Sequence, residues 1–122
     1  MRDKLNDRAR LALILEAIAN IEQFVSGTGS EQEFVSDKIL CHAVTYNIQC
    51  IGESVYMLSD EFKSNHPAMP WKSIAGQRHV LVHDYYTVSF RLIWGLVVKD
   101  IPVLKAAVKM YLEEPMPSGD GA

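Results

Sequence analysis

The residues best suited to chemistry lie in one short stretch, from Trp71 to Tyr86. Arg78, His83 and Tyr85 stand close together there, beside the apolar run Val80-Leu81-Val82. An arginine can hold a phosphate, a histidine can move a proton near neutral pH, and a tyrosine offers a hydroxyl. We therefore expect the function of the chain to reside in this stretch.

The spacing of these residues constrains how they can act together. On a regular helix Arg78 and Tyr85 share a face, whereas Arg78 and His83 lie about 140° apart around the axis. One phosphate can meet both only if the helix ends or distorts near His83, or if a second chain completes the pocket. The residues alone leave both solutions open.

Other interpretations of the same residues are structural. His83 could be a histidine held by a backbone carbonyl, and Arg78 could be a surface residue paired with Asp84. His79 and His83 have the spacing of a metal-binding pair, but no carboxylate pair or cysteine completes such a site. No metal and no cofactor are therefore expected.

Composition indicates one globular domain in a reducing compartment such as the cytoplasm. The chain has 122 residues, a net charge of −3 and two cysteines. Cys41 and Cys50 are nine residues apart on a predicted helix, so they face opposite sides and cannot form a disulfide. No apolar stretch approaches the ~20 residues of a membrane span. The acidic balance argues against a dedicated nucleic-acid scaffold, but not against a nuclease with a local phosphate site.

Apolar residues recur at three- and four-residue steps, which predicts helices almost throughout. A first helix should end at Gly27-Thr28-Gly29, and Ser30 should cap the next run. That run extends to about His66, with a break near Ser36-Asp37, where Asp37 should cap a new helix. Pro70 suits the start of the helix that carries the motif, and Thr87 or Ser89 should cap the last one.

The predicted fold is all-α, an antiparallel bundle of four to five helices. Pro102 lies inside the apolar stripe of the last helix and lacks an N–H, so that helix should be kinked near it. The helical domain should span residues 1–114. Residues 115–122 are rich in proline and glycine and are expected to be a disordered tail.

The long middle helix offers two further polar candidates. Its inner stripe is predicted to comprise Ile39, Ala43, Tyr46, Cys50 and Ile51. Glu53 follows one turn after Cys50 and should also face inward, where a charge needs a partner, and Arg78 is the obvious one. Asn47 is a candidate for the same pocket.

Three segments together resemble the HepT-like branch of the HEPN superfamily. The resemblance rests on Ile51-Gly52-Glu53, on Asp100-Ile101-Pro102-x-Leu104, and on the motif positions Trp71, Ile74, Gly76, Arg78, His79, Leu81, Val82, His83 and Tyr85. The three segments occur in the family's order. The helical layout agrees over nearly the whole chain.

The resemblance implies a homodimeric, metal-independent endoribonuclease, the toxin of a type VII-like pair with a minimal nucleotidyltransferase antitoxin. His83 would then be the general acid/base, and Arg78 would bind the scissile phosphate of the RNA. Tyr85 would be the tyrosine that the antitoxin silences by AMPylation, while Glu53, His79 and Asn47 would support the site. The alternative is a non-catalytic helical subunit that docks on a nucleotidyltransferase and binds its nucleotide or substrate.

Overall fold

The computed structural model describes residues 6–83 and 89–115, without the side chains of residues 78–83. All regular structure in these ranges is helical, which confirms the predicted all-α bundle. The elements are α1 (Asp7–Phe24), α2 (Glu31–Ser36), α3 (Lys38–Met57), α4 (Asp60–Asn65), α5 (Trp71–His83), α6 (Phe90–Gly95), the π-helical segment η2 (Leu96–Asp100) and α7 (Ile101–Glu113).

Side-chain caps set most of the helix starts. Ser30, Asp37 and Ser89 each accept a hydrogen bond from a backbone N–H of the first turn that follows, as predicted. Ser59 caps α4 in the same way, a break that the sequence analysis did not predict. Asp7 accepts hydrogen bonds from the Ser59 backbone N–H at 2.7 Å and from its hydroxyl at 2.6 Å, so the α3–α4 junction is tied to the start of α1.

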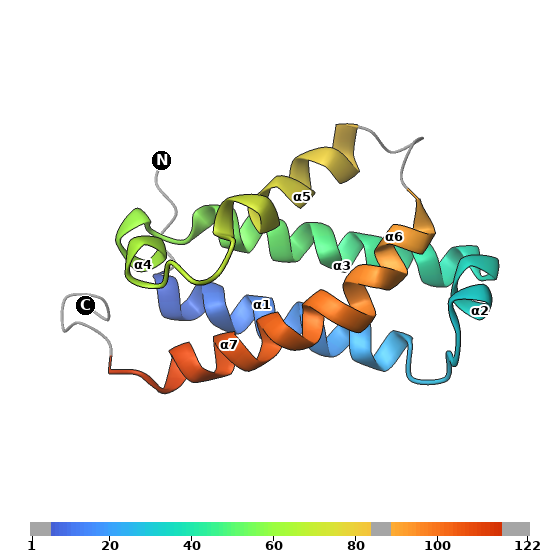
Figure 1. The fold of residues 1–122 in the computed structure, drawn as a ribbon, viewed down its shortest axis with the longest axis horizontal. Helices are drawn as coiled ribbons and strands as arrows, with labels where there is room; N and C mark the ends of the chain where they lie inside the picture. The colour runs from blue at the N-terminus through green and yellow to red at the C-terminus, as the bar shows by residue number, and fades with distance from the viewer. Residues whose placement is uncertain (1–5, 84–88, 116–122) are drawn as a thin grey trace.

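Helix α3 is the centre of the bundle. Helix α1 packs along one side of α3 and α5 along another, while α7 packs against α1 (Figure 1). The short helices α2 and α4 lie at opposite ends of α3. Five residues of the stripe predicted for the last helix are buried in the core: Ile93, Val97, Ile101, Leu104 and Val108.

The inner stripe predicted for α3 was right at Ile51 and wrong at Ile39 and Tyr46, which are 85% and 65% exposed. Ile51 fills the core together with Cys41, Val44, Ile48 and Val55. The predicted and the observed sets share Ile51, but their other members point in different directions around the axis. Neighbouring helices on two sides of α3 select the second set.

The disruption predicted near Pro102 occurs in the preceding turn. Residues Leu96–Asp100 form a π-helical segment, in which the backbone N–H of Ile101 donates to the carbonyl of Leu96, five residues back. Pro102 has no N–H to donate to the carbonyl of Val98, so the regular pattern cannot pass through this turn. Leu96 and Asp100 of this π-helical turn face α5, the helix that carries the motif.

His66 holds the start of α5 against the end of α7. Its Nδ1 lies 2.9 Å from the Phe62 carbonyl oxygen and its Nε2 lies 2.9 Å from a Glu114 carboxylate oxygen. Both partners are acceptors, so both bonds form together only when the imidazole is doubly protonated. Trp71, the first residue of α5, donates its indole N–H to the His66 carbonyl at 2.9 Å. Hydrogen bonds therefore tie the start of α5 to α4 and to the end of α7, at one corner of the bundle.

The two hydrogen bonds of His66 should make the free energy of unfolding depend on pH. Burial alone would lower the pKa of His66, but the bonds to Phe62 and Glu114 outweigh it and raise that pKa above its ordinary value. Because the pKa of His66 is higher in the folded state than in the unfolded state, the protonated imidazole stabilises the fold. This stabilisation is fully present below about pH 6.5 and is lost as the pH rises through the folded-state pKa.

We expect Glu114→Gln to lower the free energy of unfolding at pH 5.5 and to have a smaller effect at pH 8.5. Because the Glu114 side chain is 45% exposed, the difference should be at most about 1 kcal/mol. Urea unfolding of both chains at the two pH values measures it, with the neighbouring exposed Glu113→Gln as a control. An equal loss for Glu114→Gln at both pH values would contradict this account.

Candidate functional site

Helix α5 carries the chemically distinctive residues and is anchored at its first turn. The Trp71 side chain is buried, with its ring centroid 5.8 Å from that of Phe62 and 5.9 Å from that of Tyr111. From this anchor α5 runs along α3 (Figure 1). A strongly packed start gives the second half of α5 a defined direction relative to the bundle.

Arg78, His79 and His83 all lie within the bounds of α5. Helical backbone from Arg78 to His83 keeps these two positions about 140° apart around the axis. The two positions therefore lie on different sides of one isolated helix. The side chains of residues 78–83 and the whole of residues 84–88, including Tyr85, lie outside the described part of the chain.

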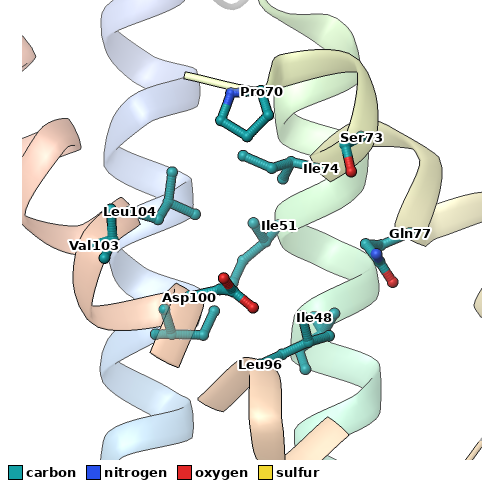
Figure 2. A pocket seen from close by; sticks show the side chains of 11 residues that line it. Ile48, Ile51, Pro70, Ser73, Ile74, Gln77, Leu96, Asp100, Val103 and Leu104 are labelled. Atoms are coloured by element: carbon teal, nitrogen blue, oxygen red, sulfur yellow. The ribbon is translucent and has the colours of Figure 1, made fainter. Parts of the chain in front are cut away.

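The first half of α5 covers an apolar cavity of about 240 Å³ (Figure 2). Ile74 and Gln77 of α5 face Ile48 and Ile51 of α3 across it. The other wall comes from η2 and α7. The Asp100 carboxylate of η2 lies among these mostly apolar side chains in Figure 2. This cavity lies beneath the motif helix, one turn before Arg78.

Gly76 leaves the α5 backbone bare two residues before Arg78. A Cβ at this position would have no heavy atom within 4 Å. No contact within the described part of the chain therefore requires a glycine here. The position leaves room for another molecule to approach the helix backbone closely.

Asn47 and Glu53 line a second hollow, of about 340 Å³, between α1 and α3. The Asn20 side chain of α1 donates to the Asn47 amide oxygen at 3.1 Å, and the Asn47 amide nitrogen donates to the Ala43 carbonyl at 2.9 Å. Asn47 is buried, and so is Ser54 beside it. The described residues lining this hollow are Leu13, Glu16, Ala17, Asn20, Tyr46, Asn47, Cys50, Glu53 and Ser54.

Glu53 was predicted to face inward, and this was wrong. The structure exposes it, while its neighbours Gly52 and Ser54 are buried. Glu53 is two residues from the core residue Ile51, which places it about 200° away around α3. The inward assignment followed from the same mistaken stripe that included Tyr46. Asn47 and Glu53 do line one hollow, and its described lining residues come from α1 and α3. A pocket that they share with Arg78 stays a prediction.

Two residues of this hollow were not singled out in the sequence. Asn20 follows Leu13 and Ala17 of α1 at helical spacing. A polar residue on the same face as these two apolar residues is the sequence pattern that could have identified it. Ser54 gave no comparable signal. The nearby Tyr46 hydroxyl bonds to the Cys50 thiol, and this bond raises the pKa of Tyr46 above its ordinary value.

The cysteines agree with the sequence analysis, since Cys41 and Cys50 are both free thiols. Burial, and next the charge of Asp37, raise the pKa of the Cys41 thiol. Its Sγ lies 3.1 Å from the Phe34 carbonyl oxygen, to which the thiol donates. In the described ranges no three His, Cys, Asp or Glu side chains are grouped as metal ligands. No helix in those ranges has both the length and the apolar character needed to span a bilayer.

Comparison with known proteins identifies the family to which this sequence is similar. Residues 14–111 match the family model "Ribonuclease HepT-like". The chain is 38% identical to "Putative RNase TTE0752" of Caldanaerobacter subterraneus subsp. tengcongensis, over 88% of this chain and 95% of that protein. It is 39% identical to "Probable ribonuclease HepT" of Thermococcus cleftensis, over 75% of this chain and 83% of that protein. No solved structure matches.

Proposed function

Because this chain belongs to the HepT-like ribonuclease family, we propose that it is a metal-independent endoribonuclease whose reaction is carried by Arg78 and His83. The observation that carries the proposal is the presence of both residues on α5, in a chain whose relatives bear ribonuclease names. Arginine is the side chain best suited to hold a phosphate, and histidine is best suited to exchange protons near neutral pH.

The proposed reaction is an internal transfer within the RNA backbone. The 2′-oxygen attacks the adjacent phosphorus, His83 accepts the 2′-hydroxyl proton, and a new O2′–P bond forms. The bond from phosphorus to the 5′-oxygen breaks, and that oxygen leaves as a hydroxyl after taking up a proton. The products are a 2′,3′-cyclic phosphate and a free 5′ end. Arg78 stabilises the charge that builds on the phosphate oxygens.

We propose that the active form is a homodimer in which two copies of α5 meet. The Arg78 and His83 positions lie about 140° apart around one helix, so a phosphate between two chains can receive Arg78 from one and His83 from the other. The bare backbone at Gly76 supports close approach on this stretch of α5. Each chain would then supply half of each site.

The same site suits control by covalent modification. We propose that the partner is a minimal nucleotidyltransferase that acts as antitoxin and attaches AMP to Tyr85, close to the phosphate site. The added group carries a negative charge and a large volume, so it repels and displaces the RNA phosphate. His79, Asn47 and Glu53 remain proposed supporting residues of the site.

The activity is tested with the unmodified chain and a single-stranded RNA in EDTA. We expect cleavage to continue in EDTA, and we expect DNA of the same sequence to stay intact because it lacks the 2′-hydroxyl. An RNA with one 2′-deoxy residue at the cut position is the matched control and should resist cleavage only there. Cleavage of the DNA would refute the mechanism, and failure to cut any RNA would favour the non-catalytic docking subunit.

A further inference from the structure

Three segments that are far apart in the sequence meet at the apolar cavity beside α5. They are the segments that carry the family resemblance, and the proposed reaction uses none of the residues that they place at the cavity. These residues are Ile51, Ile74, Asp100, Ile101 and Leu104. Four of them are apolar, and packing with the core accounts for their positions. The charged residue, Asp100, needs a different explanation.

Asp100 has no structural role within the described part of the chain. It directly precedes α7, but its side chain makes no capping hydrogen bond, and no ion pair joins it to another described residue. The π-helical turn places Asp100 on the cavity side together with Leu96. Such turns often occur at functional sites. The Asp100 carboxylate is directed toward the space between η2 and α5 (Figure 2).

The cavity has the size of a side chain rather than of a whole small molecule. Its volume of about 240 Å³ lies below the roughly 300–1,000 Å³ of typical small-molecule sites. None of the described residues that line it is aromatic, so a nucleobase would find no ring on which to stack. The walls are mostly aliphatic, and Val103, which is 62% exposed, extends them to the mouth.

Polar groups border these aliphatic walls. Ser73 and Gln77 are four residues apart on one face of α5, across the cavity from Asp100. The carboxylate, the amide oxygen and the hydroxyl can all accept hydrogen bonds. A long basic side chain suits this arrangement, because its aliphatic stem can lie on the walls while its charged end stays at the mouth. Arginine suits it better than lysine, since a guanidinium has five N–H donors in one plane.

We propose that this cavity binds an arginine side chain of a protein partner. The net charge of −3 favours a basic partner segment. A second copy of the chain is a poorer candidate, because the proposed homodimer uses the stretch of α5 at Gly76, which does not line the cavity. The inference goes beyond the proposed ribonuclease function and does not depend on it.

The test titrates the full chain with n-butylguanidinium and follows the Gln77 side-chain amide and the Leu104 methyl groups by NMR. n-Butanol is the matched neutral probe. We expect the guanidinium to bind about 5-fold more tightly, since a partly exposed ion pair contributes at most about 1 kcal/mol. Ethylguanidinium should bind about 10-fold more weakly than n-butylguanidinium, because each buried CH₂ group contributes about 0.8 kcal/mol.

Asp100→Asn keeps the size of the side chain and removes its charge. This variant should lose the 5-fold preference over n-butanol and bind n-butanol as before. The control Glu113→Gln removes an exposed carboxylate near the end of α7 and should change neither affinity. Equal binding of the butyl probes, or of the two guanidinium probes, overturns the site. Equal binding of n-butylammonium overturns the arginine in favour of a lysine, and tighter binding of spermidine does so in favour of a free polyamine.

The source of the arginine is tested with the photo-crosslinking residue benzoylphenylalanine in place of Val103, at the mouth of the cavity. We expect a cross-link to another protein, next to an arginine, and we expect Asp100→Arg to abolish it. Changing that arginine of the other protein to aspartate should restore the cross-link to the Asp100→Arg chain. A cross-link to a second copy of this chain or to RNA overturns the proposal, and so does a failure of the exchanged charges to restore it.

Discussion

His83→Ala should lower RNA cleavage in EDTA by about 10²- to 10⁴-fold, because general acid–base catalysis contributes that much to the rate. The helix should persist, since alanine is the best helix former and replaces a residue near the end of α5. Initial rates on a labelled RNA measure the loss, and a thermal unfolding curve checks the fold. The exposed His42→Ala on α3 is the matched control and should retain the wild-type rate.

Arg78→Ala should cause a comparable loss for a different reason, since it removes the group that stabilises charge on the phosphate. Arg78→Lys keeps the charge but not the two-pronged geometry, so it should recover only part of the rate. A wild-type rate in either alanine variant would disprove the assignment. If EDTA itself stops cleavage, the metal-binding pair His79 and His83 becomes the better interpretation.

Mixing the two inactive variants shows how the site is assembled. In a shared site, a heterodimer of Arg78→Ala and His83→Ala chains has one site with both residues and one with neither. Random pairing of co-expressed chains should then restore about a quarter of wild-type activity. A site contained within one chain would show no recovery, and the proposed dimeric active site would be wrong.

Tyr85→Phe should keep the nuclease active and abolish its silencing. The phenol oxygen is the only atom removed, so packing changes little, but the acceptor for AMP is gone. Mass spectrometry after co-expression with the nucleotidyltransferase should find one adenylate on the wild-type peptide that contains Tyr85 and none on the variant. The wild-type chain should lose RNA cleavage on modification, because the added phosphate competes for Arg78.

The neighbouring Tyr86→Phe is the matched control and should be modified and silenced like the wild type. Adenylate found on the Tyr85→Phe chain, at Tyr86 or elsewhere, would refute the assignment of Tyr85. A modified chain that still cleaves RNA at the wild-type rate would refute the proposed mode of control.

Much of the fold could be predicted because local signals set it. Ser30, Asp37 and Ser89 cap helices through bonds made within one turn, so sequence spacing reveals them directly. Pro102 disrupts the last helix through its own missing N–H. The motif was visible for a similar reason, since Arg78, His83 and Tyr85 lie close together in the sequence. How these three side chains meet a phosphate stays a prediction.

The sequence by itself determined the helical elements and the segment with catalytic potential, because propensity, caps and spacing act over a few residues. Only the tertiary structure decided which face of α3 is buried, since α3 carries two apolar stripes and packing against both α1 and α5 selects one. That choice turned Tyr46 and Glu53 outward. It also brought Asn20 to Asn47, two residues on separate helices whose hydrogen bond depends on how α1 and α3 align.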